Sequence, residues 1–306
     1  MNAPTSRVTL DGMTTEAVDA RFADIDRLPV AQLAALMNEA DSTVPTTVRM
    51  ALPQIVPALE AASARMQSGG RLLYVGAGTP GRIGVLDAAE CPPTFSSPPE
   101  QVFAILAGGP GAVVGAVEGA EDDAAAGAAA MDAAHVGPAD TVLGITASGR
   151  TPFVVGAIGR ARQLGALSIG LSCNAGSELT GVAEHGIEVV VGPEFISGST
   201  RLKAGTAQKL VLNMFSTIVM VRLGKTYGNL MVDVRASNGK LRERAVGIVR
   251  SITGVDRDRA VFALEQADGD VKVAVVTIRR GVDASTAREI LESTDGRLRP
   301  VMEGPA

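Results

Sequence analysis

Five short apolar runs, separated by helical or Gly/Ala-rich segments, constrain the fold of this chain more than any other feature. They lie at 72–75, 102–106, 141–145, 167–171 and 187–191. Strands that alternate with helices are typical of an α/β sandwich, because a parallel neighbouring strand is reached only through a crossover connection. Ligands of such sheets bind beyond the carboxyl ends of the strands. The loops that follow these runs are therefore the first places to look for a site.

Residues 1 to about 27 are polar and are expected to be irregular, and helices are expected in the other segments outside the sheet. The Ala/Gly run 124–130 follows three acidic residues and is better explained as a closely packed helix than as a linker. The tail from residue 252 has apolar positions for three or four short helices with a core of their own. We expect an N-terminal segment with a short helix (1–45), the sandwich (46–251) and a small helical domain (252–306). Further helices are expected over 29–37, 46–66, 201–223 and 238–251.

A glycine turn follows the first apolar run. Gly76, Gly78 and Gly81 precede an expected helix over 82–89, with Pro80 near its first turn. The free N–H groups at the start of a helix favour an anion, and phosphate is the natural ligand. The three glycines also match a dinucleotide fingerprint, but the second run ends at Leu106 without the carboxylate that a ribose needs. A smaller phosphorylated ligand is favoured over a nicotinamide, and a tight turn without a ligand is the structural alternative.

Two more clusters of hydroxyl groups precede helices. Residues 146–152 follow the third run, and residues 197–203 precede the helix expected over 201–223. Each cluster contains Ser and Thr, and the second also contains Arg201 and Lys203 at a helix start, where the dipole favours negative charge. One such cluster could be ordinary helix capping. Three in one domain favour a ligand.

Composition excludes several classes of function. The net charge of −5 argues against a general nucleic-acid surface. The N-terminus lacks the apolar core of a signal peptide, and polar residues interrupt the apolar helix near 210–223, so a soluble, cytoplasmic protein without a membrane segment is expected. Cys91 and Cys173 form no close pair, so neither a disulfide framework nor a zinc site is supported, and Cys91 is expected to be a small buried residue rather than a nucleophile. His135 and His185 lie outside any motif, so we expect no metal, and proton transfer by carboxylates or lysine.

Several longer runs together resemble a known family. The chain is similar to the N-acetylmuramic acid 6-phosphate etherases, members of the sugar isomerase (SIS) domain superfamily, over nearly its whole length. Runs of this length are far more specific than a glycine pattern. They are GRLLYVGAGT (70–79), DAAECPPT (87–94), AVEGAED (116–122), ASGRTP (147–152), LSCN (171–174), GSTRLKAGTAQKLVLNM (198–214) and GNLMVDV (228–234).

The resemblance implies a three-layer sandwich and a cofactor-free carbon–oxygen lyase. Such an enzyme cleaves the D-lactyl ether of N-acetylmuramic acid 6-phosphate by elimination and then hydration, giving N-acetylglucosamine 6-phosphate and D-lactate in the recycling of cell-wall sugar. By motif, Glu90 corresponds to the general acid and Glu121 to the general base. The resemblance also implies a homodimer and a ubiquitin-associated-like C-terminal domain. The substrate is expected to contact Gly78, Thr79, Gly81, Ser148, Gly149, Arg150, Thr151, Ser199, Thr200, Arg201 and Lys203.

The chain departs from the family pattern at two positions. Pro80 stands where the family commonly has a serine whose hydroxyl faces the sugar phosphate, so weaker binding is expected. Ala89 replaces a serine that is usual before the acidic Glu90.

Alternatives remain open. The acids around Glu121 could be a solvated helix face, and Asp87 is the nearest rival of Glu90 as the acid. A non-catalytic sugar-phosphate sensor of the glucokinase regulatory protein type and an aldose–ketose isomerase are the alternative functions. Retention of both glutamates argues against the sensor, because a sensor needs no acid/base pair.

Overall fold

The computed structural model describes residues 12–234 and 238–303, and it confirms the predicted parallel sheet. Five strands lie in the order β2-β1-β3-β4-β5, and β1–β3, β3–β4 and β4–β5 pair in parallel. All side chains of β1, β3 and β4 are buried, as expected for a parallel sheet that is covered on both faces. The strands are β1 (Leu72–Gly76), β2 (Val102–Leu106), β3 (Thr141–Ile145), β4 (Leu167–Ser172) and β5 (His185–Glu188).

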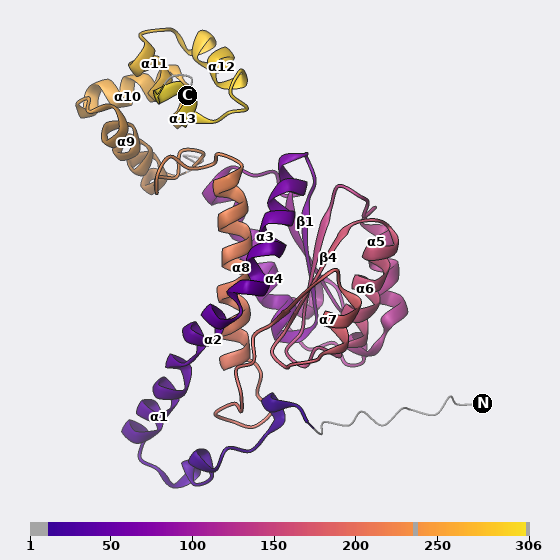
Figure 1. Cartoon of the computed structure of the whole chain (residues 1–306). Coiled ribbons are helices and arrows are strands. Elements are labelled where there is room, and N and C mark those ends of the chain that lie inside the picture. The colour runs from indigo at the N-terminus through magenta and orange to yellow at the C-terminus, as the bar shows by residue number, and fades with distance from the viewer. Residues whose placement is uncertain (1–11, 235–237, 304–306) are drawn as a thin grey trace. The chain divides into compact units, whose positions relative to one another are not determined.

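Helices cover the two faces of the sheet, which confirms the three-layer sandwich (Figure 1). One face carries α5 (Ala124–Ala133), α6 (Pro152–Gln163) and α7 (Glu178–Val182). The other carries α3 (Leu52–Gln67) with the parts of α4 (Gly78–Phe95) and α8 (Lys203–Arg222) that belong to this unit of the chain. This larger unit comprises residues 1–87 and 103–214.

The N-terminal helices differ from the prediction in one respect. The single helix predicted over 46–66 is two helices, α2 (Val44–Met50) and α3, with Ala51 between them. Pro53 in the first turn of α3 explains the break, because proline has no N–H to continue the hydrogen bonds of a preceding helix. The earlier helix, α1 (Val30–Ser42), is longer than predicted, and three single 3₁₀ turns precede it: η1 (Thr14–Glu16), η2 (Ala20–Phe22) and η3 (Ile25–Arg27).

Helix α4 corrects a second expectation, that Glu90 lies at a helix end. The helix begins at Gly78 and runs through Pro92 and Pro93 to Phe95. The amide of Ser96 still donates to the Pro92 carbonyl at 3.0 Å, so the helical path persists beyond the prolines. A continuous buried stripe at helical spacing outweighs the lost hydrogen bonds; its members are Gly84, Asp87, Ala88, Cys91 and Phe95.

The last strand lies two residues earlier than predicted. The apolar run predicted 187–191, whereas β5 is His185–Glu188 and places Gly186 opposite Gly170 of β4. A Cβ atom at Gly186 would lie 2.8 Å from Thr180 Cβ, so the close approach of α7 requires glycine there. Packing around β4 therefore decides the register of this strand, rather than hydrophobicity.

The smaller unit comprises residues 88–102 and 215–306 and contains the predicted C-terminal helices. Helices α9 to α12 each begin after a residue whose side chain accepts a hydrogen bond from the first turn, namely Asn238, Asp256, Asp270 and Asp283. Their apolar faces share one core. The domain boundaries 1–45, 46–251 and 252–306 stay predictions. The helices are α9 (Gly239–Thr253), α10 (Arg257–Gln266), α11 (Val271–Arg280), α12 (Ala284–Glu292) and α13 (Leu298–Glu303).

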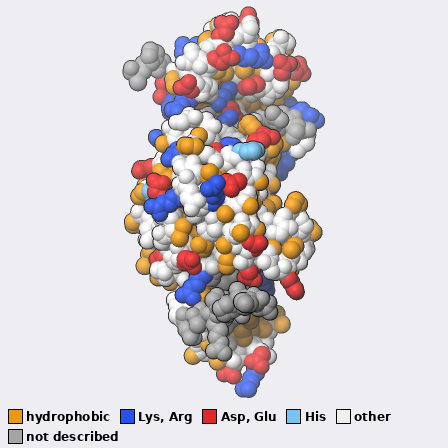
Figure 2. Space-filling view, turned by 90° about the vertical axis from the view of Figure 1, so that its right-hand side faces the viewer, with side chains coloured by type: hydrophobic (Ala, Val, Ile, Leu, Met, Phe, Trp, Pro, Cys, Tyr) orange, Lys and Arg blue, Asp and Glu red, His pale blue; other side chains and the backbone are white. Residues whose placement is uncertain are grey.

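On the face shown in Figure 2, Lys and Arg side chains are interspersed with Asp and Glu, in keeping with the small net charge of −5. Among the residues that the structure describes, no helix has the length and apolar character needed to span a membrane.

The Ala/Gly run is the closely packed helix α5, as predicted. A Cβ atom at Gly127 would lie 1.9 Å from the Phe153 carbonyl oxygen on α6. A Cβ atom at Gly156 on α6 would lie 2.1 Å from the Ala124 carbonyl oxygen on α5. The two glycines therefore let α5 and α6 approach at backbone distance.

We expect Gly127→Ala to destabilise the protein although alanine favours helices. The helix propensity gained is about 1 kcal/mol, whereas an overpacked core loses about 1–3 kcal/mol or more when the backbone must shift. Gly159→Ala is the matched control, because Gly159 lies within α6 and a Cβ atom there would make only ordinary contact, 3.7 Å from Val182 Cγ1. Denaturant unfolding of both variants checks this, and equal midpoints would contradict it.

Candidate functional site

The first predicted loop lies at the carboxyl end of β1, where the strand passes into α4. A Cβ atom at Gly76 would lie 2.6 Å from the Gly81 amide nitrogen, and one at Gly81 would lie 2.2 Å from Leu106 Cδ1. Packing alone therefore explains these two glycines. Gly78 differs, because it has a φ of +57° and nothing lies within 4 Å of a Cβ there. Its amide is one of the first in α4, which have no intrahelical acceptor.

The start of α8 lies beside this loop. A Cβ atom at Gly205 would lie 3.6 Å from Thr79 Cγ2 and 3.5 Å from the Thr200 carbonyl oxygen. The structure thus brings Thr79 of the first cluster next to the turn that contains Thr200 of the third.

The second loop, at the end of β3, holds a chain of hydroxyl groups. Thr146 Oγ1 lies 2.7 Å from Thr151 Oγ1 and 3.1 Å from Ser148 Oγ, which accepts from the Arg150 amide at 3.2 Å. Among the described residues, no side chain caps the start of α6. The capping alternative is therefore wrong for this loop. Pro152 has no N–H and the Val154 amide donates to the Thr151 carbonyl at 3.0 Å, so Phe153 supplies the first amide of α6 that could meet an anion.

Gly149 fixes the path of the same loop. It has a φ of +73°, and a Cβ atom there would lie 2.2 Å from Ser177 Cβ. Its carbonyl accepts from the Leu179 amide at 2.9 Å. A side chain at this position would collide with Ser177 and Ser172, so only glycine fits.

The start of α8 is not open to a ligand in the way that the sequence suggested. The Glu194 carboxylate accepts hydrogen bonds from the Lys203 and Ala204 amides, each at 2.9 Å, and Glu194 is 1% exposed. A carboxylate of the chain itself therefore occupies the positive end of this helix. Sequence reasoning missed Glu194 because it lies nine residues before the helix, far from the usual capping position.

Lys203 has a structural role in the same arrangement. Its side chain is buried, and Nζ donates to the Val191 carbonyl at 2.7 Å. Burial lowers the pKa of this ammonium. The position of Lys203 does not support the predicted contact with substrate, whereas Arg201 is exposed and Ser199 and Thr200 are half-buried.

Asn174, after β4, ties the second and third clusters to the N-terminal segment. Its Nδ2 donates to the Ala147 carbonyl at 2.9 Å, and its Oδ1 accepts from the Thr14 amide at 2.7 Å. The Gly198 amide in turn donates to the Thr15 carbonyl at 3.0 Å. Residues 14–16 therefore bridge the loops after β3 and β4 and the loop before α8.

Asp87 is a buried carboxylate with fixed partners. Tyr74 Oη donates to its Oδ2 at 2.7 Å, and Asn213 Nδ2 donates to its Oδ1 at 2.5 Å. Glu90, one turn later on α4, is exposed, and so is Glu121 in the 3₁₀ turn η5 (Ala120–Asp122). Burial and fixed partners make Asp87 the weaker candidate for a substrate acid, which favours Glu90.

Both cysteines are buried, as predicted for Cys91. Burial raises the pKa of the Cys173 thiol to about 12, so the reactive thiolate is scarce at neutral pH.

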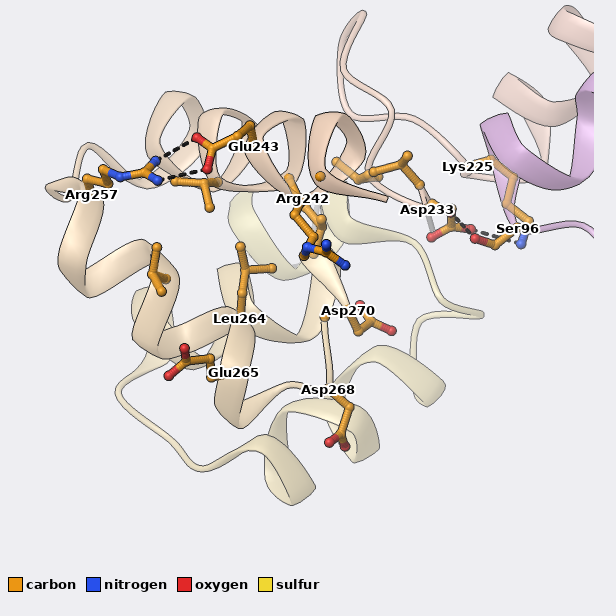
Figure 3. A pocket seen from close by; sticks show the side chains of 18 residues that line it. Ser96, Lys225, Asp233, Arg242, Glu243, Arg257, Leu264, Glu265, Asp268 and Asp270 are labelled. Atoms are coloured by element: carbon orange, nitrogen blue, oxygen red, sulfur yellow. Dashed lines mark hydrogen bonds and ion pairs between the residues drawn. The ribbon is translucent and has the colours of Figure 1, made fainter. Parts of the chain in front are cut away.

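A cavity of about 1100 Å³ in the smaller unit contains none of the predicted site residues (Figure 3). Its charged lining is largely paired, because Arg257 binds Glu243 and Lys225 binds Asp233, each at 2.8 Å. Those pairs stabilise the smaller unit and suggest no chemistry.

We expect Glu194 to give stability a distinctive pH dependence. Burial raises the pKa of its carboxyl, and the N–H groups of Ala204 and Lys203 offset this effect only in part. Because the folded pKa exceeds the unfolded value, the native state retains the proton to higher pH. The contribution of Glu194 to stability is therefore greatest below the unfolded pKa, about 4.3, and falls as pH rises through the folded pKa.

Denaturant unfolding across this pH range checks the expectation. Wild type should lose stability relative to Glu194→Gln as pH rises. Replacement of the exposed Glu100 by Gln is the control and should leave the pH profile of wild type unchanged. A difference between wild type and Glu194→Gln that does not vary with pH would contradict the assignment.

Two family models match the region that contains the sheet, and a third matches part of the C-terminal helices. The model of the glucokinase regulatory protein N-terminal SIS domain matches residues 54–162, that of the SIS domain 122–218, and that of a UBA-like domain 249–277. The chain is 56% identical to the N-acetylmuramic acid 6-phosphate etherase of Streptomyces avermitilis, over 96% of this chain and 94% of that protein. It is 56% identical to the etherase of Streptomyces coelicolor (98% and 96% covered) and 53% identical to that of Rubrobacter xylanophilus (92% and 94%). Identity of this degree over nearly the whole of both chains shows the family, and the chain belongs to the N-acetylmuramic acid 6-phosphate etherases.

Proposed function

We propose that this protein cleaves the D-lactyl ether of N-acetylmuramic acid 6-phosphate, giving N-acetylglucosamine 6-phosphate and D-lactate. The hydroxyl chain of Ser148, Thr146 and Thr151 at the uncapped start of α6 is the observation that carries the proposal. It supplies the donors that a sugar phosphate needs at the carboxyl edge of the sheet. The reaction would serve the recycling of cell-wall amino sugar in the cytoplasm, by a homodimer.

In the proposed mechanism the sugar reacts as its open-chain aldehyde. The C2 proton is acidic because the carbonyl accepts the electrons that the proton leaves behind. Glu121 removes this proton, a double bond forms between C2 and C3, and the bond from C3 to the lactyl oxygen breaks. Glu90 protonates the departing oxygen. Water then adds at C3 and a proton returns to C2, so no cofactor is required.

The starts of α4 and α6 are the proposed phosphate site. Gly78, Thr79 and Gly81 would offer amides and a hydroxyl at α4, and Ser148, Gly149, Arg150 and Thr151 would do so at α6. Ser199, Thr200 and Arg201 complete the proposed set beside Thr79. We leave Lys203 out, because its ammonium donates to the Val191 carbonyl.

A regulator that binds sugar phosphate without turnover is the second candidate. The match to the glucokinase regulatory protein SIS domain over residues 54–162 favours it. An aldose–ketose isomerase is the third, since it also removes a proton beside a carbonyl. Product analysis separates them, because only ether cleavage releases D-lactate.

We expect wild-type protein to release D-lactate from N-acetylmuramic acid 6-phosphate, and Glu90→Gln and Glu121→Gln to lose about 10²–10⁴-fold in kcat, the usual contribution of a general acid or base. Glu118→Gln, in the same exposed segment as Glu121, is the matched control and should keep its activity. Retained activity in either glutamine variant would remove that residue from the mechanism. Folded wild type that binds the sugar phosphate but releases no lactate would establish the regulator instead.

Pro80→Ser is expected to lower the KM for substrate. The serine would restore a hydroxyl at the start of α4, and a hydrogen bond to a charged group contributes about 1.5–3 kcal/mol, or at least about tenfold in affinity. Pro80→Ala restores only the backbone N–H and serves as the control. An unchanged KM in Pro80→Ser would show that this position does not face the phosphate.

A further inference from the structure

Arg82 connects the first loop to the segment that carries Glu121. It lies in the second turn of α4, directly after Gly81, and its guanidinium group reaches a loop about thirty residues further along the chain. Nε donates to the Ala112 and Val113 carbonyls at 3.0 and 3.1 Å, and Nη2 donates to the Gly115 carbonyl at 3.0 Å. The half-buried guanidinium group of Arg82 thus donates hydrogen bonds to three carbonyl groups of a single loop.

The loop that it holds leads from β2 to Glu121. It begins at Gly108, whose φ is +83° and where a Cβ atom would lie 2.8 Å from Val117 Cβ. It includes the 3₁₀ turn η4 (Pro110–Val113) and ends at Gly119, with a φ of +74°, just before η5. Val114 is 93% exposed, so hydrophobic burial at that residue does not fix the middle of the loop.

Both ends of the loop are attached to the rest of the sandwich. The Ala107 amide donates to the Gly76 carbonyl at 3.0 Å, and Asp123 caps α5 through the Ala126 amide at 2.8 Å. Between these attachments, the guanidinium of Arg82 links the loop to the helix that begins at the predicted phosphate site. A shift of that link would move Glu121 relative to Gly78 and Thr79.

We propose that Arg82 is a positioning residue for the general base: it holds the 110–115 segment so that Glu121 stands at a fixed place relative to a phosphate bound at the start of α4. The inference rests on the proposed function and deepens it. Arg82 contacts neither the substrate nor the reacting atoms. Because a displacement of about 1 Å in a reacting group can reduce the rate about 10²-fold, loss of the link should lower kcat and leave phosphate binding intact.

The test compares Arg82→Gln and Arg82→Lys with Arg162→Gln in the full chain. Arg162 is a matched control, because its Nη1 donates to the Val182 carbonyl at 2.9 Å from a helix on the opposite face of the sheet. D-lactate release from N-acetylmuramic acid 6-phosphate gives kcat and KM, and inorganic phosphate serves as a competitive probe. We expect Arg82→Gln to lose about 10–100-fold in kcat with less than a threefold change in KM and in phosphate inhibition, and added guanidinium ion to restore part of the rate. Arg82→Lys should lose less, and Arg162→Gln should match wild type.

Amide hydrogen exchange provides a second measurement that does not depend on turnover. In Arg82→Gln, the amides of residues 110–121 should exchange faster than in wild type. The exchange rates of the amides in β1 and α6 should not change. Wild-type kcat in Arg82→Gln, equal losses in kcat and phosphate affinity, or unchanged exchange over 110–121 would each overturn the inference. Absence of lactate release by wild type would instead refute the proposed function, and the exchange result would still decide whether Arg82 holds the loop.

Discussion

The contact between Gly76 and Gly81 is the constraint on which the site depends. It lets the backbone of α4 rest on the end of β1, at a distance that a single methyl group on either residue would prevent. The helix start that results places Gly78 and Thr79 in the first turn of α4 and Arg82 in the second. The same helix then aligns Asp87 with Tyr74 on β1 and Asn213 on α8, which fixes its rotation as well as its position. One close approach of two backbones thus determines where amides, a hydroxyl and a guanidinium can act.

The helix starts near the candidate site differ in whether a carboxylate of the chain itself occupies them. Glu194 occupies the start of α8, where burial raises the pKa of its carboxyl and the Ala204 and Lys203 amides and the Lys203 ammonium offset this rise only in part. Within the part of the chain that the structure describes, no side chain caps the corresponding position at α6. A phosphate in this region would therefore find the start of α6 uncapped and the start of α8 already occupied by Glu194. The hydrogen bonds of Glu194 also fix the first turn of α8, where a Cβ atom at Gly205 would lie close to both Thr200 and Thr79.

Much of the fold could be predicted from the sequence, because each buried strand is a short run of apolar residues between turn signals. The runs of β2 and β3 match the structure residue for residue, whereas β5 is displaced because a glycine contact with α7 outweighs hydrophobicity. The predicted end of α4 near Glu90 failed for a similar reason: local proline rules do not include a buried stripe that continues to Phe95. The three loops of the site were visible as motifs, but Glu194 and the reach of Arg82 were not. Both act across many residues of sequence, and such pairs leave no local pattern.

The contrast between Asp87 and the two glutamates bears on how the proposed reaction can work. A general acid must give up a proton to the substrate and a base must take one, so each needs a carboxyl group that the substrate can reach. Asp87 is buried and accepts two hydrogen bonds from neutral donors, an arrangement that suits a structural carboxylate. Glu90 and Glu121 are exposed side chains of the single chain. An acid and a base of the same residue type need surroundings that make their pKa values differ. On the proposed mechanism, the bound sugar or a second subunit would supply such surroundings for Glu90 and Glu121. Substrate binding would in that case assemble the acid/base pair as well as orient the ether, and a fixed loop under Glu121 would matter most at that step.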